Sequence, residues 1–399
     1  MPRVGYLALV GAVGWLAACS DGGQSQKAQA DTKVAQDPAA APASAQLLPA
    51  SDIPTSAAVG SLAALAPTSS APVAVAPAPD LPPAAQTING ATFTTAAAKP
   101  ATGWSVTGVD PALIKAEVLL DRAGFSPGVI DGRKGQNLSN AVAAYAQTHG
   151  LPAAGQLNQA VWDSLSQADA MPATQVYQIT ADDEAGPFIG TPPKDYNDLA
   201  KLPALGYSDI QQMLSEKFHM DRKLLLALNP GADFSKAGTS IIVAAPGPQR
   251  DFKVTRIEVD KSNEVVRAYD GDKLVAFYPA TVGSTERPAP SGVFSVRGVA
   301  PHPVYYYDPK RLTFTPEGAT GKLKIAPGPN NPVGSTWIAL TIPTYGIHGA
   351  PDPSLIGKRQ SHGCVRLTNW DAVELGHSVK AGAKVAFVGS EKPQAGAKT

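Results

Sequence analysis

The chain has 399 residues, of which 37 are Gly and 37 are Pro, and its 33 basic residues balance its 33 acidic residues. This length indicates about two to three domains, and the balanced charge excludes a protein whose overall field attracts nucleic acid or an anionic membrane surface. Cys19 and Cys364 are the two cysteines, which excludes a disulfide-rich fold and a four-cysteine zinc site.

Residues 1–19 have the pattern of an export signal. Arg3 precedes an apolar stretch from Val4 to Trp15, a length typical of a signal peptide rather than of a membrane span. The following Leu16-Ala17-Ala18-Cys19 resembles a bacterial lipobox, which implies cleavage before Cys19 and attachment of lipid to that residue. Because Ser20 rather than Asp comes next, we expect a lipid anchor on the periplasmic side of the envelope, in the outer membrane of a Gram-negative cell. An ordinary signal peptide with an incidental cysteine is the alternative.

Residues 20–105 are expected to form a disordered tether rich in Ala and Pro. Residues 21–100 contain 24 Ala and 11 Pro, with Phe93 as their one aromatic residue. Such a composition buries too little apolar surface to offset the entropy lost on folding. An alanine-rich helix is the alternative, but the scattered prolines would interrupt it. We expect the tether to give a folded domain reach from a lipid anchor.

Residues 106–169 show helical periodicity in three runs. The apolar positions are Ile114, Val118, Leu119 and Leu120, then Leu138, Val142 and Tyr145, then Leu157, Val161 and Leu165. The turn-rich loop from Gly124 to Gly132, with Gly150-Leu151-Pro152, Gly155 and Trp162, resembles the type 1 peptidoglycan-binding domain. The resemblance implies a small three-helix domain that binds peptidoglycan. A helical spacer without a ligand is the alternative, and His149 alone makes no zinc site.

Residues 205–246 indicate a second small module. Two runs have helical spacing, namely Ile210, Met213, Leu214 and Phe218, and then Leu224, Leu225 and Leu228. Asn229-Pro230-Gly231 ends the second helix, and Ser240–Val243 is typical of a short strand. The run from Leu225 to Gly231, with Ala237-Gly238-Thr239, resembles the LysM repeat, an α+β unit of order β-α-α-β that binds glycan. Its first strand is not evident, and a module that binds no glycan is the alternative.

Residues 252–388 change to a period of two, which predicts a domain dominated by β-strands, followed by a flexible tail at 389–399. The predicted strands are Arg256–Asp260, Val265–Tyr269, Lys273–Tyr278, Gly292–Arg297, Trp337–Ile342 and Lys384–Val388, with a hairpin at Asp270-Gly271. The turn-rich segment from Val304 to Pro332 predicts a lid or binding loop. Thr368 and Asp371 have the spacing of a capping box, which predicts a helix that ends at Gly382.

Cys364 is the residue with the clearest chemical signal. If Cys19 carries lipid, Cys364 has no disulfide partner within the chain, and a lone thiol in an exported protein indicates a reactive or intermolecular cysteine. His348 and His362 lie within 16 residues of it, and a neighbouring imidazole activates a thiol. Gly363 permits a close approach of the backbone to substrate. Two alternatives compete: a buried structural cysteine, and a metal site of His348, His362 and Cys364 that has no evident fourth ligand.

The run Ser361-His362-Gly363-Cys364-Val365-Arg366-Leu367, preceded by His348-Gly349, closely resembles the L,D-transpeptidase (YkuD) family. The resemblance covers residues 252–388 and includes Ser291-Gly292-Val293-Phe294 and Asn331-Pro332-Val333-Gly334. It implies a YkuD-like catalytic domain dominated by β-structure, so that the whole chain is multidomain, with the two small modules and the tether before it.

The resemblance also implies a role for each residue of the motif. Cys364 is the nucleophile, and His348 is the general base and later the acid, oriented by the Gly349 carbonyl. His362 and Gly363 shape the pocket, and N–H groups near Gly363 and Cys364 stabilise the oxyanion. Ser361 and Arg366 hold the loop or contact a substrate carboxylate, with a structural salt bridge as the alternative for Arg366. We expect Tyr305, Tyr306 and Tyr307 to contact substrate from the predicted lid.

The implied reaction begins on a tetrapeptide stem of peptidoglycan. Cys364 forms a thioester as D-alanine leaves, and an amine of a second stem then gives a 3→3 cross-link, without a metal or an organic cofactor. The implied partners are stem peptides, glycan and, through the lipid, a membrane. The same thioester could instead serve lipoprotein attachment, D-amino acid exchange or hydrolysis. A non-catalytic peptidoglycan-binding tether is the alternative of a different class.

Overall fold

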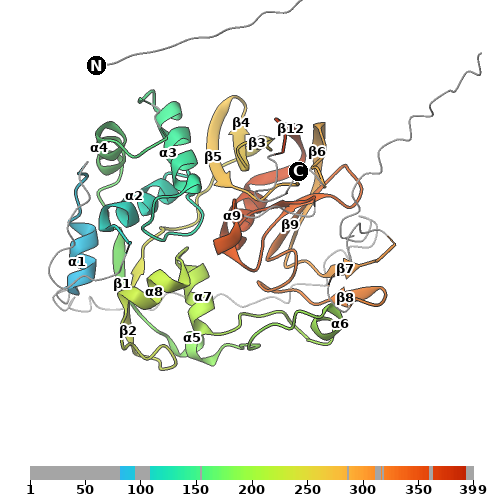
Figure 1. The fold of residues 1–399 in the computed structure, drawn as a ribbon, viewed down its shortest axis with the longest axis horizontal. Coiled ribbons are helices and arrows are strands. Elements are labelled where there is room, and N and C mark those ends of the chain that lie inside the picture. The colour runs from blue at the N-terminus through green and yellow to red at the C-terminus, as the bar shows by residue number, and fades with distance from the viewer. Residues whose placement is uncertain are drawn as a thin grey trace, which may run out of the picture. The chain divides into compact units, whose positions relative to one another are not determined.

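The computed structural model describes residues 81–94, 108–152, 155–284, 287–310, 316, 319–358 and 363–391. The chain divides into two units between residues 40 and 41, and every described residue belongs to the second (Figure 1). The predicted signal sequence, Cys19 and most of the predicted tether lie outside the described residues. Within the described ranges, no helix is both long and apolar enough to cross a bilayer.

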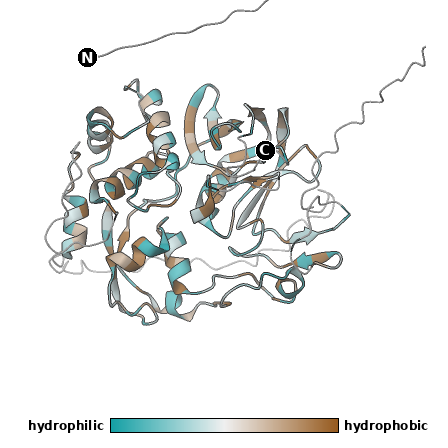
Figure 2. Ribbon diagram, viewed as in Figure 1, coloured by the Kyte–Doolittle hydropathy of each residue, from teal (hydrophilic) through white to brown (hydrophobic). Residues whose placement is uncertain are grey.

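The predicted helical domain contains the three expected helices. They are α2 (Pro111–Arg122), α3 (Gln136–Thr148) and α4 (Gln159–Ala168). Asp110 caps α2 by accepting from the Ala112 N–H, and Asn158 caps α4 by accepting from the Val161 N–H. Most of the predicted apolar positions pack in one core between the helices, whereas Ile114 and Val118 of α2 lie in a different core, together with residues of the second module. Figure 2 shows hydrophobic residues along α2 among hydrophilic ones. Leu157 lies just before α4 and packs partly buried against the same core.

The loop after α2 covers the edge of the large sheet. The Phe277 N–H donates to the Gly124 carbonyl at 2.8 Å, and the Ser126 N–H donates to the Phe277 carbonyl at 2.9 Å. Phe277 and Val265 join the core of the helical domain. Strand β5 (Lys273–Pro279), which ends the sheet, is therefore partly paired by the helical domain rather than left open.

One part of the predicted tether is folded. Residues 83–89 form helix α1 (Pro83–Asn89), so the prediction of disorder is wrong for these residues of the 20–105 segment. Ala85 and Ile88 are fully buried in a core shared with α2 and the second module, and the Thr174 N–H donates to the Asn89 side chain at 2.9 Å. Burial against these distant residues stabilises a short helix that would be marginal by itself.

The second module has the order β-α-α-β. Strand β1 (Thr174–Gln178) pairs antiparallel with β2 (Ser240–Ala244), and α7 (Ile210–Lys217) and α8 (Arg222–Leu228) lie between them in sequence. The first strand therefore lies outside 205–246. Only one of its five residues is buried, so it carries no alternating apolar pattern in the sequence. The short helices α5 (Ala181–Ala185) and α6 (Tyr196–Leu199) occupy the connection from β1 to α7.

The C-terminal domain is built on an eight-stranded sheet, as the predicted dominance of β-structure requires. Its order is β11-β10-β9-β6-β12-β3-β4-β5. The strands besides β5 are β3 (Val254–Asp260), β4 (Val265–Asp270), β6 (Gly292–Pro301), β9 (Thr336–Leu340), β10 (Gly346–His348), β11 (Val365–Arg366) and β12 (Val379–Val388). All six predicted strands are present, whereas β10 and β11 are too short to show a pattern in sequence.

Two further elements frame the sheet. Helix α9 (Asn369–Ser378) is capped by Thr368, whose side chain accepts from the Asp371 N–H. The helix ends at Ser378 and the chain turns directly into β12, so the prediction that it ends at Gly382 is wrong. The predicted lid contains a hairpin of β7 (Tyr305–Tyr307) and β8 (Leu323–Ile325), and a 3₁₀ turn covers Pro353–Leu355.

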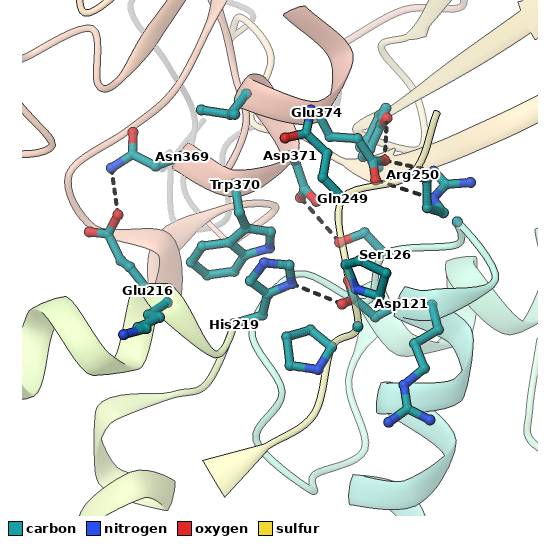
Figure 3. Close-up of a pocket in the computed structure, with 18 of the residues that line it drawn as sticks. Asp121, Ser126, Glu216, His219, Gln249, Arg250, Asn369, Trp370, Asp371 and Glu374 are labelled. Carbon is teal, nitrogen blue, oxygen red and sulfur yellow. Dashed lines mark hydrogen bonds and ion pairs between the residues drawn. The ribbon is translucent and has the colours of Figure 1, made fainter. Parts of the chain in front are cut away.

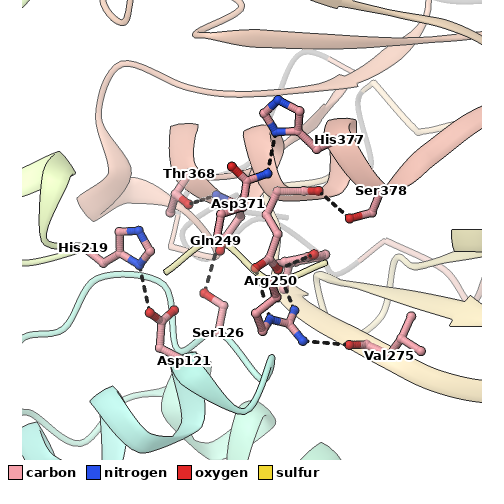
Figure 4. Close-up of polar contacts among 12 residues, drawn as sticks. Asp121, Ser126, His219, Gln249, Arg250, Val275, Thr368, Asp371, His377 and Ser378 are labelled. Atoms are coloured by element: carbon pink, nitrogen blue, oxygen red, sulfur yellow. Dashed lines mark hydrogen bonds and ion pairs between the residues drawn. The ribbon is translucent and has the colours of Figure 1, made fainter. Parts of the chain in front are cut away.

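Arg250 ties the linker between the second module and the sheet to α9. Its Nη2 lies 2.6 Å from Glu374 Oε1 and its Nε lies 3.1 Å from Glu374 Oε2 (Figure 3). Its Nη1 donates to the Val275 carbonyl at 3.0 Å (Figure 4). Both side chains are about three-quarters buried. A two-point ion pair of this kind is stronger than an exposed pair.

We expect Arg250→Met to lower the free energy of unfolding by about 2 kcal/mol, because Glu374 would lose its charged partner in a partly buried position. Arg222, which pairs with Asp209 on the surface, is the control. Arg222→Met should cost less than about 1 kcal/mol. Urea denaturation of both variants measures the difference, and equal losses would contradict the importance of the Arg250 pair.

Candidate active site

The register of three short strands brings the motif residues into one row. His348 on β10 pairs with Trp337 on β9 and, on its other side, with Arg366 on β11. Their neighbours Ile338, Ile347 and Val365 are fully buried in the main core on the opposite face. Cys364 directly precedes β11, and its side chain packs against the cluster that contains Trp337 as well as against the main core.

The indole ring of Trp337 stacks against the imidazole of His348. The two rings are nearly parallel, with centroids 5.4 Å apart and planes 21° apart. Gly346 makes this position possible, because a Cβ there would lie 2.7 Å from the indole ring. Trp337 is 3% exposed, so the histidine rests on a buried aromatic surface rather than on water.

His348 is held in one tautomer. Its Nδ1 lies 2.6 Å from the carbonyl oxygen of Gly349. A carbonyl only accepts, so Nδ1 carries the proton and Nε2 of the neutral ring keeps its lone pair. An imidazole in this state can take a proton at Nε2.

The surroundings keep His348 neutral. The side chain is 3% exposed, and burial, with the nearby positive charge of Arg366, lowers its pKa to about 3. Hydrogen bonds to the carbonyl groups of Gly349 and Val333 raise the pKa of His348, but they only partly offset the effect of burial. The ring is therefore an unprotonated base over the whole physiological pH range.

Cys364 lies between two apolar clusters and is half-buried. The residue before it, Gly363, has φ of +128°, a conformation that favours glycine. The hydroxyl of Tyr345 donates a hydrogen bond to the Gly363 carbonyl. Burial, followed by the nearby charge of Cys364, raises the pKa of Tyr345 well above its usual value, so this hydroxyl keeps its proton.

Arg366 is fixed through its backbone. Its N–H donates to the Thr281 carbonyl and its carbonyl accepts from the Thr281 N–H, both at 2.9 Å. In the part of the chain that the structure describes, no carboxylate lies within ion-pair distance of its guanidinium. The structural salt bridge weighed as the alternative for Arg366 is thus not found among those residues.

Three tyrosines, Tyr196, Tyr305 and Tyr307, pack together beside Trp337 and are called the aromatic wall below. Tyr305 and Tyr307 are buried in one cluster with Trp337 and Cys364, whereas Tyr306 alternates to the other side of β7 and is half-buried. Tyr196 of α6 contacts both buried tyrosines edge to face, with ring centroids 6.2 and 5.9 Å apart. Burial raises the pKa of Tyr196 to about 12, and the charge of Arg366 opposes this shift, so the phenol stays protonated.

The connection from β1 to α7 places Tyr196 next to the site. Its residues 196–205 are called the strap below. Leu199 and Leu205, which lie between β1 and α7 in sequence, are buried in the same cluster as Tyr305 and Trp337. The Leu205 N–H donates to the Pro327 carbonyl at 2.8 Å, and the Asn330 N–H donates to the Leu205 carbonyl at 3.0 Å. The strap is therefore bonded to the segment that follows the β7–β8 hairpin.

The structure brings together His348, Gly349, Gly363, Cys364, Arg366, Tyr305 and Tyr307 from the predicted site. Ser361 and His362 lie outside the described residues. Sequence reasoning missed Tyr345, Trp337 and Tyr196 as parts of the site. Trp337 carried only a strand signal, and nothing local marks Tyr345 or Tyr196. Among the described residues, no group of three or more His, Cys, Asp or Glu side chains is placed to hold a metal ion.

The chain is similar to known proteins over two regions. Residues 254–386 match the L,D-transpeptidase catalytic domain (YkuD), and residues 110–165 match a putative peptidoglycan binding domain. Over 179 residues the chain is 33% identical to the putative L,D-transpeptidase YkuD of Bacillus licheniformis, covering 44% of this chain and 92% of the relative. The putative L,D-transpeptidase YkuD of Bacillus subtilis is 27% identical over the same shares. The crystal structure of an L,D-transpeptidase from Xylanimonas cellulosilytica is 15% identical with a TM-score of 0.33, and the match covers 73% of this chain and 100% of that chain.

The lowered pKa of His348 predicts a loss of stability in acid. Between pH 7 and pH 5 the unfolded chain takes up a proton at this side chain, whose ordinary pKa is 6.5, whereas the folded protein does not. The wild type should therefore lose about 2 kcal/mol more free energy of unfolding over this range than His348→Gln. Urea denaturation of both proteins at the two pH values measures this, and an equal pH dependence would refute it.

Proposed function

Because the chain belongs to the L,D-transpeptidase (YkuD) family of cysteine transpeptidases that act on the cell wall, we propose that it forms 3→3 cross-links in peptidoglycan. The observation that supports the proposal is that Cys364 packs against the cluster containing Trp337, whose ring stacks on a neutral His348 with its proton on Nδ1. A thiol beside an imidazole with a free Nε2 lone pair suits nucleophilic catalysis.

In the first step, Nε2 of His348 takes the proton of the Cys364 thiol. The sulfur attacks the carbonyl carbon of the third residue of a tetrapeptide stem, and a C–S bond forms. The imidazolium then gives its proton to the nitrogen of the fourth residue. The C–N bond breaks, D-alanine leaves, and a thioester remains on Cys364.

Tyr345 orients the peptide group that would stabilise the oxyanion. Its hydroxyl holds the Gly363 carbonyl, and in a trans peptide the N–H of the next residue points the opposite way. The Cys364 N–H is thereby turned away from Tyr345, and a donor of this kind stabilises an oxygen that becomes negative in the transition state. We assign it this role together with the N–H groups near Gly363.

In the second step, the amine of a second stem attacks the thioester. His348 accepts the proton of the attacking nitrogen, an amide bond forms, and the sulfur leaves to recover its proton from the imidazolium. Both half-reactions use the same base and the same oxyanion donors. The chain's own residues thus supply every proton transfer of the cycle.

The surrounding residues suit a peptide with a carboxylate. The Arg366 guanidinium offers a two-point contact to a carboxylate group of the stem, and Ser361 and His362 of the motif would line the same pocket. We assign the wall of Tyr305, Tyr307 and Tyr196 to apolar contact with the stem, with Tyr306 at its outer side.

The remaining modules suit an enzyme that acts on a polymer. The helical domain that matches a peptidoglycan-binding domain and the LysM-like module would hold glycan and raise the local concentration of stems. Lipid on Cys19 would anchor the chain on the periplasmic side of the envelope. The same thioester could transfer the stem to a lipoprotein amine, a D-amino acid or water, according to which acceptor enters the site.

Loss of the sulfur tests the proposal. We expect the full-length protein to convert a tetrapeptide muropeptide to a 3→3 dimer with release of D-alanine, and Cys364→Ala to release none. Mass spectrometry of the products separates cross-linking from hydrolysis and from exchange. A carbapenem should add its mass to the wild type and not to Cys364→Ala. The same product from both proteins would refute the assignment.

Tyr345→Phe tests the orientation of the oxyanion donor. Removal of one hydroxyl frees the Gly363–Cys364 peptide group, so we expect kcat to fall about 10- to 100-fold. The stem still contacts Arg366 and the aromatic wall, so KM should change little. Steady-state kinetics with the tetrapeptide measures both constants. An unchanged kcat would show that Tyr345 has a purely structural role.

A further inference from the structure

Asn369, the first residue of α9, joins three segments with one side-chain amide. Its Nδ2 donates to Glu216 Oε2 at 2.9 Å, as Figure 3 shows. Its Nδ2 also donates to the Pro329 carbonyl at 3.1 Å, and its Oδ1 accepts from the Ser335 N–H at 3.0 Å. Asn369 is 4% exposed. Its amide therefore has a fixed orientation in a place that water scarcely reaches.

The amide of Asn369 lies directly against the backbone that orients His348. A Cβ at Gly349 would lie 2.3 Å from Asn369 Oδ1, and a Cβ at Gly334 would lie equally close to it. Gly349 supplies the carbonyl that holds His348 Nδ1. A shift of the Asn369 side chain would therefore move the support of the imidazole.

Glu216 reaches this point from another module. It lies on α7, between the two strands of the LysM-like module, and its side chain points to Asn369 in Figure 3. It is 6% exposed, and burial raises its pKa to about 7 against the opposing hydrogen bonds from Asn369 and Gln212. A carboxyl group is costly to bury, and this one is held by two side-chain donors.

A second polar link strengthens the contact between the same segments. Gln212, one turn before Glu216, donates to Asn330 Oδ1 at 2.9 Å and accepts from Asn330 Nδ2 at 3.0 Å. Asn330 stands just before the Asn331–Gly334 turn, which leads to Ser335. The face of α7 that carries Gln212 and Glu216 thus bonds to Asn330 before that turn and is linked through Asn369 to Ser335 after it.

We infer that Glu216 is a positioning residue for transpeptidation, through which the LysM-like module fixes Asn369 and, with it, the Ser335 and Gly349 backbone that orients His348. This inference rests on the proposed role of His348 as the general base. Docking of the module is then a condition for catalysis in addition to any affinity for glycan. The hydrogen bond between Glu216 and Asn369 joins two modules of the same chain and involves no group of the substrate.

The helical domain offers a matched control on the same helix. Ser126 donates to Asp371 Oδ2 at 3.1 Å, which is a buried hydrogen bond from another domain to α9, two residues beyond Asn369 (Figures 3 and 4). Asp371 contacts neither Ser335 nor Gly349 by any hydrogen bond of the described residues. Ser126→Ala therefore removes a cross-domain bond of similar burial without touching the support of His348.

The experiment compares Glu216→Leu, Glu216→Gln and Ser126→Ala in the full-length protein. Glu216→Leu should lower kcat for dimer formation about 10- to 100-fold with KM nearly unchanged, because supporting residues of a site act on geometry. Glu216→Gln keeps an acceptor for Asn369 and should recover kcat to within about threefold of the wild type. Ser126→Ala should keep the wild-type kcat. Each variant is assayed well below its own midpoint of thermal unfolding.

A second readout does not depend on the cross-linking reaction. The rate of alkylation of Cys364 by iodoacetamide, followed by mass spectrometry of its peptide, reports thiolate formation assisted by His348. It should fall in Glu216→Leu and stay unchanged in Glu216→Gln and Ser126→Ala. If Glu216→Leu does not fold, Glu216→Ala takes its place.

The outcomes separate the two proposals. Equal kcat and equal alkylation in Glu216→Leu and Ser126→Ala would overturn the role of Glu216 while leaving the proposed function intact. A wild type that makes no dimer, but whose Cys364 reactivity depends on Glu216 as expected, would refute 3→3 cross-linking and support the positioning role. Failure of Glu216→Gln to recover kcat would also overturn the inference.

Discussion

The hydrogen bond from His348 Nδ1 to the Gly349 carbonyl is the constraint on which the site depends. It fixes the tautomer, and burial over Trp337 keeps the ring neutral and dry. A neutral imidazole keeps its Nε2 lone pair, whereas a solvated histidine would be partly protonated near neutral pH. The position of the ring depends on the Gly349 peptide group, so residues that pack on Gly349 also affect the position of His348.

Helix α9 connects the other modules to the backbone around His348. Glu374 near its middle pairs with Arg250 of the linker, and Asp371 accepts from Ser126 of the helical domain. Asn369 at the start of the helix donates to Glu216 of the second small module. Trp370 stacks on His219, with ring centroids 4.9 Å apart, and His219 bonds to Asp121 of α2. Figures 3 and 4 show these contacts on neighbouring turns of the same helix. Buried polar contacts of this kind specify one geometry, since each is costly when its partner is absent.

The aromatic residues beside the candidate site are likewise shared between modules. The segment between β1 and α7 brings Tyr196 against Tyr305 and Tyr307, so these ring contacts involve the same module that carries Glu216. Domains that only concentrate an enzyme on its polymer need no such contacts. A module that completes a wall and supports the base couples its own position to the chemistry.

Local spacing and periodic burial were enough to predict the motif of His348, Gly349 and Cys364, the helices of the helical domain and the longer strands. The other features depend on contacts between distant parts of the chain. Strand β1 is mostly exposed and shows no alternation, α1 is stable only against distant residues, and the end of α9 at Ser378 follows from its connection to β12. Tyr345, Tyr196 and Glu216 reach the site from positions without a local signal. Their placement depends on contacts between residues far apart in the chain, such as Glu216 and Asn369, and no periodicity of neighbouring side chains encodes such a contact.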